Sequence, residues 1–257
     1  MSRGHRPRKR FGQHFLTDAT TIGQIVAAIQ PQDSDILVEV GPGQGAISEP
    51  LAKLAGEFHA IELDRDLAAV LRRQFASQAN VTIHEGDVLK FDFPTIGTEL
   101  RIVGNLPYNI STPLLFRLVE FRQAIHDMHF MLQKEVVDLM AAGPGSKTYG
   151  RLSIMLGCHF QIDALFDVDR QAFEPPPEVT SAVVRLAPLP EGTYVINDEE
   201  RFSRIVAQAF SQRRKTIRNS LRNVADEALL ESVGIDPGLR PEAISIADYV
   251  RLSNALE

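Results

Sequence analysis

The sequence predicts an α/β protein in which a mainly parallel β-sheet, with helices on both faces, precedes a small all-α domain. Short runs of aliphatic and β-branched residues alternate with amphipathic helical patterns over the first half of the chain. Such alternation is typical of parallel sheets. In the last quarter of the chain the apolar residues instead recur at helical spacing, which predicts helices.

The predicted elements of the sheet follow one another closely. Strand-like runs cover 35–40, 57–63, 81–87, 100–106 and 128–133, and helical patterns cover 67–78, 112–121 and 135–142. Two further strand-like runs, 159–168 and 180–186, have no long helix between them. They predict a closing hairpin that adds an antiparallel strand at the edge of the sheet.

The chain is predicted to divide into two domains. The stretch "APLPEGTYVIND" at 187–198 has the prolines and glycine typical of a linker. Beyond it, apolar residues recur at helical spacing over 202–210 and again over 241–256. The predicted domains are 1–189, which begins with a basic arm at 1–11, and 190–257.

Basic residues are concentrated in two segments of an otherwise acidic chain, whose net charge is −6. Residues 1–10 and residues 211–223 each carry five Lys or Arg and no acid, so the remaining 17 basic residues face all 33 acidic ones. A basic surface on an acidic body is typical of proteins that bind a polyanion. Either segment alone could be an ordinary solvated one, but the two together favour RNA or DNA.

The composition also indicates where the protein works. The single cysteine, Cys158, cannot form a disulfide within the chain, which fits a reducing cytoplasm. No apolar run approaches the length of a membrane-spanning helix. The Arg-rich start lacks the apolar core of a signal peptide and the serines of a transit peptide, so we expect it to belong to the mature protein. We predict a cytoplasmic protein without membrane contact, and nothing requires more than a monomer.

Three of the predicted strands end in residues that suit a ligand site, because ligands of open parallel sheets bind at the carboxyl ends of the strands. The first strand runs into a loop with Gly41, Gly43 and Gly45, which let a backbone turn sharply and approach a ligand closely. The second strand ends at Glu62, whose carboxylate could accept hydrogen bonds from both hydroxyls of a ribose. The third ends at Asp87, which could accept one from an adenine amino group.

These residues alone leave two cofactors open. The spacing Gly41-x-Gly43-x-x-Ala46, with Glu62 downstream, satisfies the dinucleotide-binding fingerprint. The same arrangement suits S-adenosylmethionine, and the loop alone does not distinguish a nicotinamide cofactor from S-adenosylmethionine. A glycine loop can also be only a tight turn between a strand and a helix, but the acids at two strand ends argue against this interpretation.

The residues after the fourth strand, Asn105-Leu106-Pro107-Tyr108, distinguish the two cofactors. An exocyclic amino nitrogen on a base is a poor nucleophile because its lone pair is delocalised into the ring. The Asn105 side-chain oxygen and the Leu106 carbonyl could hold its two hydrogens and favour a directed lone pair. Pro107 would stiffen this loop, and Tyr108 could stack on an extruded base. Hydride transfer needs none of these groups, so the stretch favours methyl transfer. The less favoured alternative is a Pro-Tyr turn that only caps the strand, with Asn105 bonded to local backbone.

At this point the chain resembles the ribosomal RNA adenine N6,N6-dimethyltransferases of the KsgA type. The resemblance rests on collinear motifs from about residue 8 to the last helix: "RKRFGQHFL", "VEVGPGQG", "IELDRDL", "NLPYNIS", "MHFMLQKEV", "YGRLS", "FEPPPEVTSAVVRL" and "QRRKTIRNSL". It implies a Rossmann-like, seven-stranded methyltransferase sheet and a C-terminal helical domain that binds RNA. It also implies that S-adenosylmethionine supplies four methyl groups to two adjacent adenosines near the 3′ end of 16S rRNA, in the immature small ribosomal subunit.

The resemblance also assigns site residues. The cofactor residues are then His14, Leu16, Gly41, Gly43, Gly45, Glu62, Asp87 and Asn105, and the residues at the target base are Asn105, Leu106, Pro107, Tyr108 and Phe173. Position 14 is His where some relatives have Asn, so a contact through an amide side chain cannot be assumed there. An imidazole can still donate one hydrogen bond.

The basic segments supply the candidate RNA contacts. The predicted RNA-binding residues are Arg8, Lys9, Arg10, Arg213, Arg214, Lys215, Arg218 and Arg222. If the second segment is helical, Arg214, Arg218 and Arg222 fall at i, i+4 and i+8 on one face. No metal site is predicted, because the chain has one cysteine and no cluster of carboxylates beside His126 and His129.

Two other functions stay open at this stage. One is an adenine methylase of large-subunit rRNA of the antibiotic-resistance type, which shares the glycine loop and motifs like "NLPY". The other is a ribosome assembly factor whose binding to an immature subunit matters more than its chemistry. The segment "QRRKTIRNSL" and the collinear match favour methylation of the small subunit.

Overall fold

The structure is a computed structural model that describes residues 14–212 and 214–256, except for the side chain of Tyr108. The chain divides into two compact units, each with its own contacts. The first unit consists of Met1–Val137 and Asp163–Pro188, and the second of Asp138–Ile162 and Leu189–Glu257. The second unit thus contains a segment that lies within the predicted first domain, so the exact domain boundaries stay a prediction.

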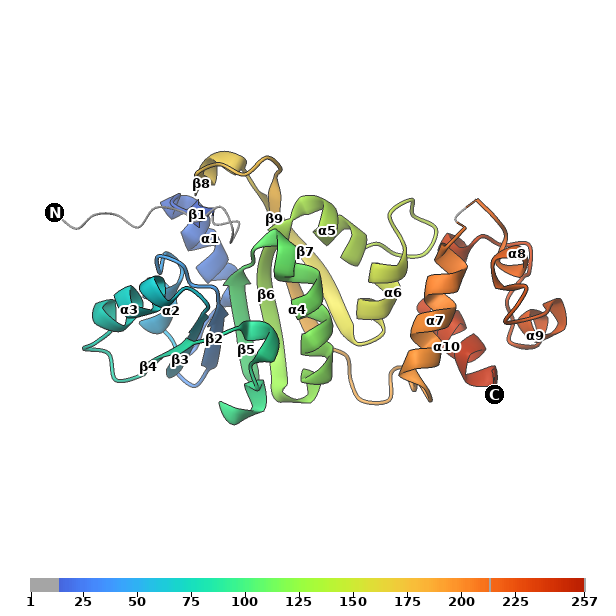
Figure 1. Cartoon of the computed structure of the whole chain (residues 1–257), viewed down its shortest axis with the longest axis horizontal. Coiled ribbons are helices and arrows are strands. Elements are labelled where there is room, and N and C mark those ends of the chain that lie inside the picture. Colours follow the sequence, from blue (N-terminus) through green and yellow to red (C-terminus); the bar gives the residue numbers. More distant parts are fainter. Residues whose placement is uncertain (1–13, 213, 257) are drawn as a thin grey trace. The chain divides into compact units, whose positions relative to one another are not determined.

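A seven-stranded sheet forms the centre of the first unit, with the strand order β4-β3-β2-β5-β6-β9-β7 (Figure 1). The strands are β2 (Ile36–Val40), β3 (Glu57–Glu62), β4 (Val81–Glu85), β5 (Leu100–Asn105), β6 (Ile125–Gln133), β7 (Phe160–Val168) and β9 (Ser181–Pro188). The pairs β4–β3, β3–β2, β2–β5 and β5–β6 are parallel, whereas β9 is antiparallel to β6. The predicted α/β fold class is therefore confirmed.

The antiparallel strand lies one place further in than predicted. β9 pairs with β6 and leaves β7 at the edge of the sheet. The burial of the two strands explains this order: the first four residues of β9 are all buried, while β7 is mostly half-buried or exposed along its length. The more apolar strand takes the covered position, since burial of apolar surface is the main stabilising contribution.

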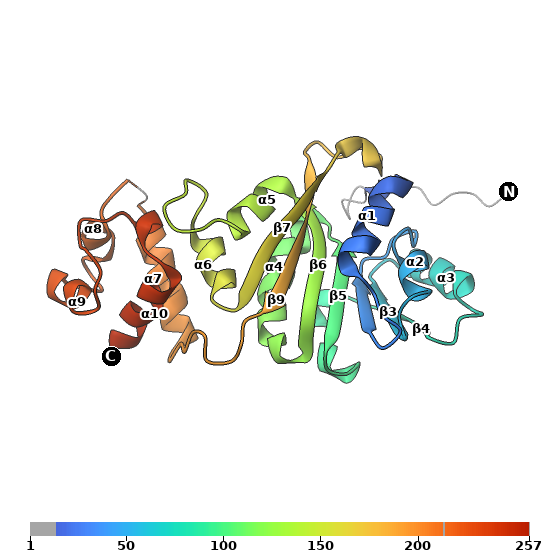
Figure 2. The same cartoon turned by 180° about the vertical axis from the view of Figure 1, so that it is seen from behind.

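Helices cover both faces of this sheet. α1 (Ala19–Ile29) and α4 (Tyr108–Glu120) lie on opposite faces, as Figures 1 and 2 show from the two sides. The other helices of the unit are α2 (Ser48–Ala52), α3 (Arg65–Gln74) and, at the boundary, α5 (Lys134–Met140). Asp18 caps α1 by accepting from the Thr21 N–H at 2.7 Å, which satisfies one of the free donors of the first turn.

A second, two-stranded sheet joins segments that lie far apart in the sequence. β1 (Phe15–Leu16) pairs antiparallel with β8 (Phe173–Glu174), with Phe15 opposite Glu174 and Leu16 opposite Phe173. The Thr17 N–H continues the connection by donating to the Ala172 carbonyl at 2.8 Å. This pairing brings the start of the described chain beside the segment that carries Phe173.

The described part of the second unit is helical. Its helices are α6 (Arg151–Gly157), α7 (Glu199–Phe210), α8 (Ile217–Leu221), α9 (Glu227–Ser232) and α10 (Ile246–Ala255). The rings of Tyr149, Phe210 and Tyr249 pack together at centroid distances of 6.4 and 6.2 Å. α7 and α10 correspond to the two helical patterns of the sequence.

The basic segment 211–222 is not one helix, so the prediction that Arg214, Arg218 and Arg222 share a helix face is wrong. α7 ends at Phe210 and α8 spans only Ile217–Leu221. The chain leaves the helical path because Ile217 is fully buried and its N–H donates to the Leu239 carbonyl at 2.7 Å. Burying this side chain therefore outweighs continuing the helix.

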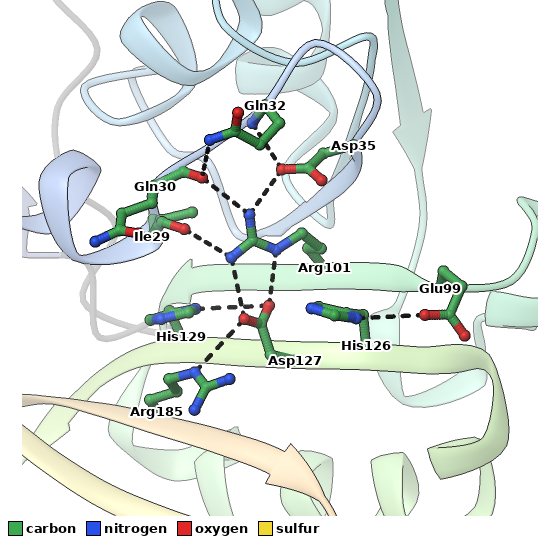
Figure 3. A network of polar contacts seen from close by, with 10 residues as sticks. All are labelled: Ile29, Gln30, Gln32, Asp35, Glu99, Arg101, His126, Asp127, His129 and Arg185. Atoms are coloured by element: carbon green, nitrogen blue, oxygen red, sulfur yellow. Dashed lines mark hydrogen bonds and ion pairs between the residues drawn. The ribbon is translucent and has the colours of Figure 1, made fainter.

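A buried ion network lies at the amino ends of the sheet strands (Figure 3). Arg101 of β5 donates to both carboxylate oxygens of Asp127 of β6, at 2.9 and 3.0 Å, and to Asp35 at 2.7 Å. It also donates to the Ile29 carbonyl at 2.6 Å, so it ties the end of α1 to the sheet. Burial alone would raise the pKa of Asp127, but the hydrogen bonds and charge of Arg101 hold this pKa below its ordinary value.

Among the described residues, the helices are too short or too polar to traverse a lipid bilayer.

Candidate active site

A cavity opens at the carboxyl edge of the parallel strands, within the first unit. It encloses about 1220 Å³, counting the part that is open to solvent. The residues around it come from the ends of β2, β3 and β5, from the turn after β4, and from β1 and β8. Ligands of open α/β sheets bind at this edge.

Most of the predicted site residues meet in this cavity. Those that line it are His14, Leu16, Gly41, Gly43, Glu62, Asp87, Asn105, Leu106, Pro107 and Phe173. Gly45 does not line it: a Cβ at this position would lie 3.2 Å from a methyl group of Leu71, so the glycine allows close packing against α3. Tyr108 begins α4, but its side chain lies outside the described residues.

The glycine loop and Glu62 are hydrogen-bonded to each other. Gly43 has a φ of +59°, in the left-handed region that favours glycine, and its N–H donates to Glu62 Oε2 at 3.1 Å. The Asp64 N–H donates to Glu62 Oε1 at 2.8 Å. Burial is the main cause that raises the pKa of Glu62, although these two backbone donors oppose the shift. The carboxyl is thus held in place at the end of β3.

Asp87 is positioned by the turn that follows β4. Its Oδ1 accepts from the Leu89 N–H at 3.0 Å, which caps the short helix Val88–Lys90. Leu63 and Val88, next to the two acids, also line the cavity, and Leu63 is exposed. Carboxyl groups beside apolar side chains suit a flat, hydrogen-bonding ligand such as an adenosine.

The amide of Asn105 is oriented by a contact with the start of the described chain. Its Nδ2 donates to the His14 carbonyl at 3.2 Å, so the amide oxygen is the end that is turned away from this contact. The His14 ring Nδ1 lies 2.8 Å from the Pro175 carbonyl, and because a carbonyl only accepts, Nδ1 is the donor. His14 therefore links Asn105 to the segment that carries Phe173.

The close approach of β5 to β2 determines the position of Asn105. A Cβ at Gly104 would lie 2.6 Å from the Val40 carbonyl oxygen, so a larger residue here would push β5 away from β2. Glycine at 104 thus places Asn105 next to the glycine loop.

Several lining residues were not predicted, and three of them had a signal in the sequence. Phe15 lies between two predicted residues and packs on the loop, 3.2 Å from where a Cβ of Gly43 would be. Leu63 directly follows Glu62. Glu39 is an acid inside the apolar run "ILVEV", directly before the loop, where a solvated position is not expected.

Of the predicted RNA-binding residues, those that the structure describes do not line this cavity. Arg8, Lys9, Arg10 and Arg213 lie outside the described residues. Arg214 and Lys215 are exposed in the turn between α7 and α8. Arg218 forms an ion pair with Glu227 of α9, so it has an acidic partner that the sequence did not suggest. Arg222 is exposed at the end of α8.

Over residues 14–212 and 214–256, no three His, Cys, Asp or Glu side chains gather in a way that could hold a metal ion.

The family comparison covers nearly the whole chain. The family model described as "Ribosomal RNA adenine dimethylase" matches residues 4–257. A protein named ribosomal RNA small subunit methyltransferase A, from Aromatoleum aromaticum, is 54% identical over 97% of this chain and 94% of its own. The protein of the same name from Dechloromonas aromatica is 51% identical over 99% of both chains.

Two solved structures with related titles have a similar fold. A dimethyladenosine transferase from Plasmodium falciparum has a TM-score of 0.82 at 26% identity, over 93% of this chain and 96% of its own. The 23S rRNA methyltransferase ErmE has a TM-score of 0.75 at 27% identity, over 94% of this chain and 99% of its own. The curated relatives that act on the small subunit are thus about twice as similar in sequence as this large-subunit enzyme.

Proposed function

The chain belongs to the ribosomal RNA adenine dimethylase family, and from this we propose that it methylates the N6 amino groups of two adjacent adenosines near the 3′ end of 16S rRNA. The methyl donor is S-adenosylmethionine, and the substrate is the RNA within the immature small ribosomal subunit. The protein acts as a monomer in the cytoplasm. The names of relatives at 51–54% identity support the small subunit as the target.

The cavity fits the proposed cofactor. The carboxyl groups of Glu62 and Asp87 lie at neighbouring strand ends, with the exposed Leu63 between them in the sequence. In the proposal Glu62 binds the ribose hydroxyls, Asp87 binds the adenine amino group, and Leu63 contacts the adenine ring. S-adenosylmethionine supplies a methyl group that is already activated by the sulfonium, so the chain needs no metal and no strong base.

The orientation of the Asn105 amide is the observation that carries the proposal. Because one N–H of Nδ2 donates to the His14 carbonyl, the amide is oriented with Oδ1, an acceptor, on the side away from this contact. An acceptor is what the amino group of adenine requires, whereas a target carbonyl would require a donor. The Leu106 carbonyl provides the second acceptor, Pro107 stiffens the loop, and Tyr108 and Phe173 contact the base on its faces.

Methyl transfer to isolated subunits tests the function directly. Small and large ribosomal subunits from cells that lack adenine dimethylation are incubated with the protein and S-adenosylmethionine labelled in its methyl group. We expect four methyl groups per small subunit, on two adjacent adenosines mapped by mass spectrometry, and none on the large subunit. Label in 23S rRNA would support the ErmE-like alternative instead, and label in neither would refute the methyltransferase proposal.

RNA binding by the second unit is tested through its salt dependence. Each phosphate contact that is lost lowers the slope of log affinity against log salt by about 0.7–0.9. We expect Arg214→Gln with Lys215→Gln to lower this slope by about 1.5 for small-subunit RNA. Arg204→Gln is the control, because Arg204 of α7 is also exposed but is paired with Glu200 at 2.6 Å. An unchanged slope in the double variant would place the RNA contacts elsewhere.

A further inference from the structure

Two histidines on neighbouring strands are hydrogen-bonded to each other. His59 of β3 and His84 of β4 are partly buried, and Nδ1 of His59 lies 3.0 Å from Nε2 of His84. His59 pairs with Thr82 in the strand register, so His84 takes the diagonal position on the same face of the sheet. Neither ring lines the cavity, and the proposed chemistry uses neither.

The two rings lie end to end. Their centroids are 5.3 Å apart and their planes deviate by 17°. The centroid distance exceeds the distance between the two nitrogens by roughly the width of a ring, so both nitrogens lie on the line that joins the ring centres. A single proton between them therefore forms a nearly straight hydrogen bond, and there is no room for a second proton.

Glu57 determines which ring donates. Its carboxylate lies 3.5 Å from Nε2 of His59, the nitrogen that does not face His84. A carboxylate accepts hydrogen bonds, so Nε2 of a neutral His59 carries the proton and its Nδ1 is the acceptor. His84 then donates through Nε2, and its Nδ1 is the nitrogen that can take up a further proton.

His84 also contacts the turn that carries Asp87, residues 86–91. Phe91, at the end of this turn, packs on the His84 ring with a centroid distance of 5.1 Å and an angle of 68° between the planes. At the other end the Gly86 N–H donates to the carbonyl of the last residue of β3 at 3.0 Å. The turn is thus held by a backbone bond at one end and by the His84 ring at the other.

The groups around the pair determine what protonation does to it. Among the described residues, Arg72 of α3 is the cation that acts on His84, and it pairs with Glu85 at 3.2 Å. Burial, and the charges of His59 and Arg72, lower the pKa of His84. A first extra proton joins Nδ1 of His84 and leaves the hydrogen bond intact. A second must join Nδ1 of His59, between the rings, and breaks it.

We propose that His84 is a positioning residue for Asp87, and that the pair of histidines releases the Asp87 turn when both rings are protonated. The inference rests on the proposed function, in which Asp87 binds the adenine amino group. With two extra protons, taken up from solvent, the N–H groups of two cationic rings face each other and the rings move apart. Phe91 then loses its contact, and the protein binds the adenosine part of the cofactor more weakly in acid.

Nuclear magnetic resonance of the ring nitrogens tests the hydrogen bond. In protein labelled with ¹⁵N in its histidines, we expect a nitrogen–nitrogen coupling between Nδ1 of His59 and Nε2 of His84 at pH 7.5. The coupling should disappear as the pH is lowered to 4.5. Absence of the coupling at pH 7.5, or its persistence at pH 4.5, would overturn the proposal.

Ligand binding tests the effect on Asp87. Methylthioadenosine, which has the adenosine part of the cofactor and no amino acid part, is titrated by calorimetry into the unmodified protein and into His59→Asn. The Asn oxygen accepts from His84 at either pH, so this variant should keep the turn in place. We expect equal affinities at pH 7.5. At pH 4.5 the unmodified protein should bind about 2- to 10-fold more weakly than the variant, which is the equivalent of one aromatic pair.

Substitutions of His84 test the contact with Phe91. His84→Ala should weaken binding about 2- to 10-fold already at pH 7.5, because Phe91 loses its partner. His84→Phe keeps a ring that cannot be protonated, so it should restore the affinity and resemble His59→Asn at pH 4.5. His126→Asn is the control, because His126 is exposed on β6, and it should behave as the unmodified protein does.

The outcomes separate the inference from the proposed function. Equal affinity of the unmodified protein and His59→Asn at pH 4.5, or unchanged affinity in His84→Ala at pH 7.5, would refute the inference and leave the cofactor intact. If neither methylthioadenosine nor S-adenosylmethionine binds the unmodified protein at pH 7.5, the cofactor itself is refuted, and the inference with it. If His84→Ala does not fold, His84→Phe decides, since binding as weak as that of the unmodified protein at pH 4.5 would contradict the switch.

Discussion

The two ends of the same strands treat buried charge in opposite ways. At the amino ends, the Asp127 carboxylate accepts from Arg101 at 2.9 and 3.0 Å, and Arg101 is also bound by Asp35 (Figure 3). At the carboxyl ends, Glu39 and Glu62 are also buried, but among the described residues they accept from a hydroxyl and from backbone N–H groups and not from a cation. The pKa of Asp127 is lowered, whereas those of both glutamates are raised.

This difference distinguishes residues that stabilise the fold from residues that we propose to bind a ligand. Charges that are paired within the chain stabilise it only as a pair, and losing one partner leaves the other buried and uncompensated. Under the proposed function, acids that have no cation among the described residues are instead compensated when the cofactor binds. Substitutions at the two ends should therefore change different quantities, stability at one and binding or turnover at the other.

The largest effect is expected from Asp127→Ala at the amino ends. It leaves the buried Arg101 without its bidentate partner, which should lower the free energy of unfolding by about 3–5 kcal/mol. Unfolding in urea, followed by circular dichroism, measures the loss, and cofactor affinity under native conditions should not change. Asp163→Ala is the control, because Asp163 is a half-exposed carboxylate 3.7 Å from Arg185. A loss below 1 kcal/mol would mean that the network does not stabilise the fold.

Asn105→Ala should show the opposite behaviour at the carboxyl ends. It removes the acceptor for the target amino group, and removing one such preorganised contact typically lowers kcat by about 100-fold or more. Stability and the affinity for RNA should change little. Single-turnover methylation with labelled cofactor measures the effect. Asn105→Asp sharpens the test, because it keeps an acceptor but loses the donation to the His14 carbonyl. Its activity should fall between that of Asn105→Ala and that of the unmodified protein.

Glu62→Gln should weaken cofactor binding by about 10–100-fold, since a hydrogen bond to a charged group contributes about 1.5–3 kcal/mol. Its free energy of unfolding should change by less than about 1 kcal/mol, because removing a buried charge offsets the lost acceptor for one backbone N–H. Calorimetry and urea unfolding give the two quantities. A large loss of stability with unchanged affinity would remove Glu62 from the ligand site and reverse the comparison.

The sequence predicted the carboxyl edge better than the rest of the molecule. The strand ends that carry Gly41, Glu62, Asp87 and Asn105 could be located because short apolar runs and their turn residues are local signals. The parallel order of the strands then places these ends at one edge. The resemblance added His14, Leu16 and Phe173, whose positions depend on the pairing of β1 with β8 over more than 150 residues.

What the sequence did not predict depends on contacts distant along the chain. The break between α7 and α8 follows from the burial of Ile217 and its bond to Leu239, while the local residues favour a continuous helix. The inner place of β9 depends on competition between two strands for β6. The pairing of Arg101 with Asp127 joins a residue of one predicted strand to the residue directly before another, and neither residue type identifies its partner.

The smallest effect concerns His129, which shares β6 with Asp127 but has no hydrogen-bond partner for either ring nitrogen among the described residues. Burial, helped by the charges of Arg101 and Arg185 and opposed by Asp127, lowers the pKa of His129 to about 4. The unfolded chain, with an ordinary pKa near 6.5, therefore takes up this proton first as the pH falls. The contribution of neutral His129 to the free energy of unfolding is therefore fully present above pH 6.5 and is lost progressively between pH 6.5 and 4.

At pH 5.5 the loss attributable to His129 should be about 1.4 kcal/mol relative to pH 7.5. Urea unfolding at a series of pH values measures it, and His129→Leu should flatten this part of the profile. His126→Leu is the matched control, because His126 lies on the same strand but is exposed beside Glu99 (Figure 3). If His129→Leu keeps the full pH dependence, another group titrates there, and the amino ends of the strands are fully compensated.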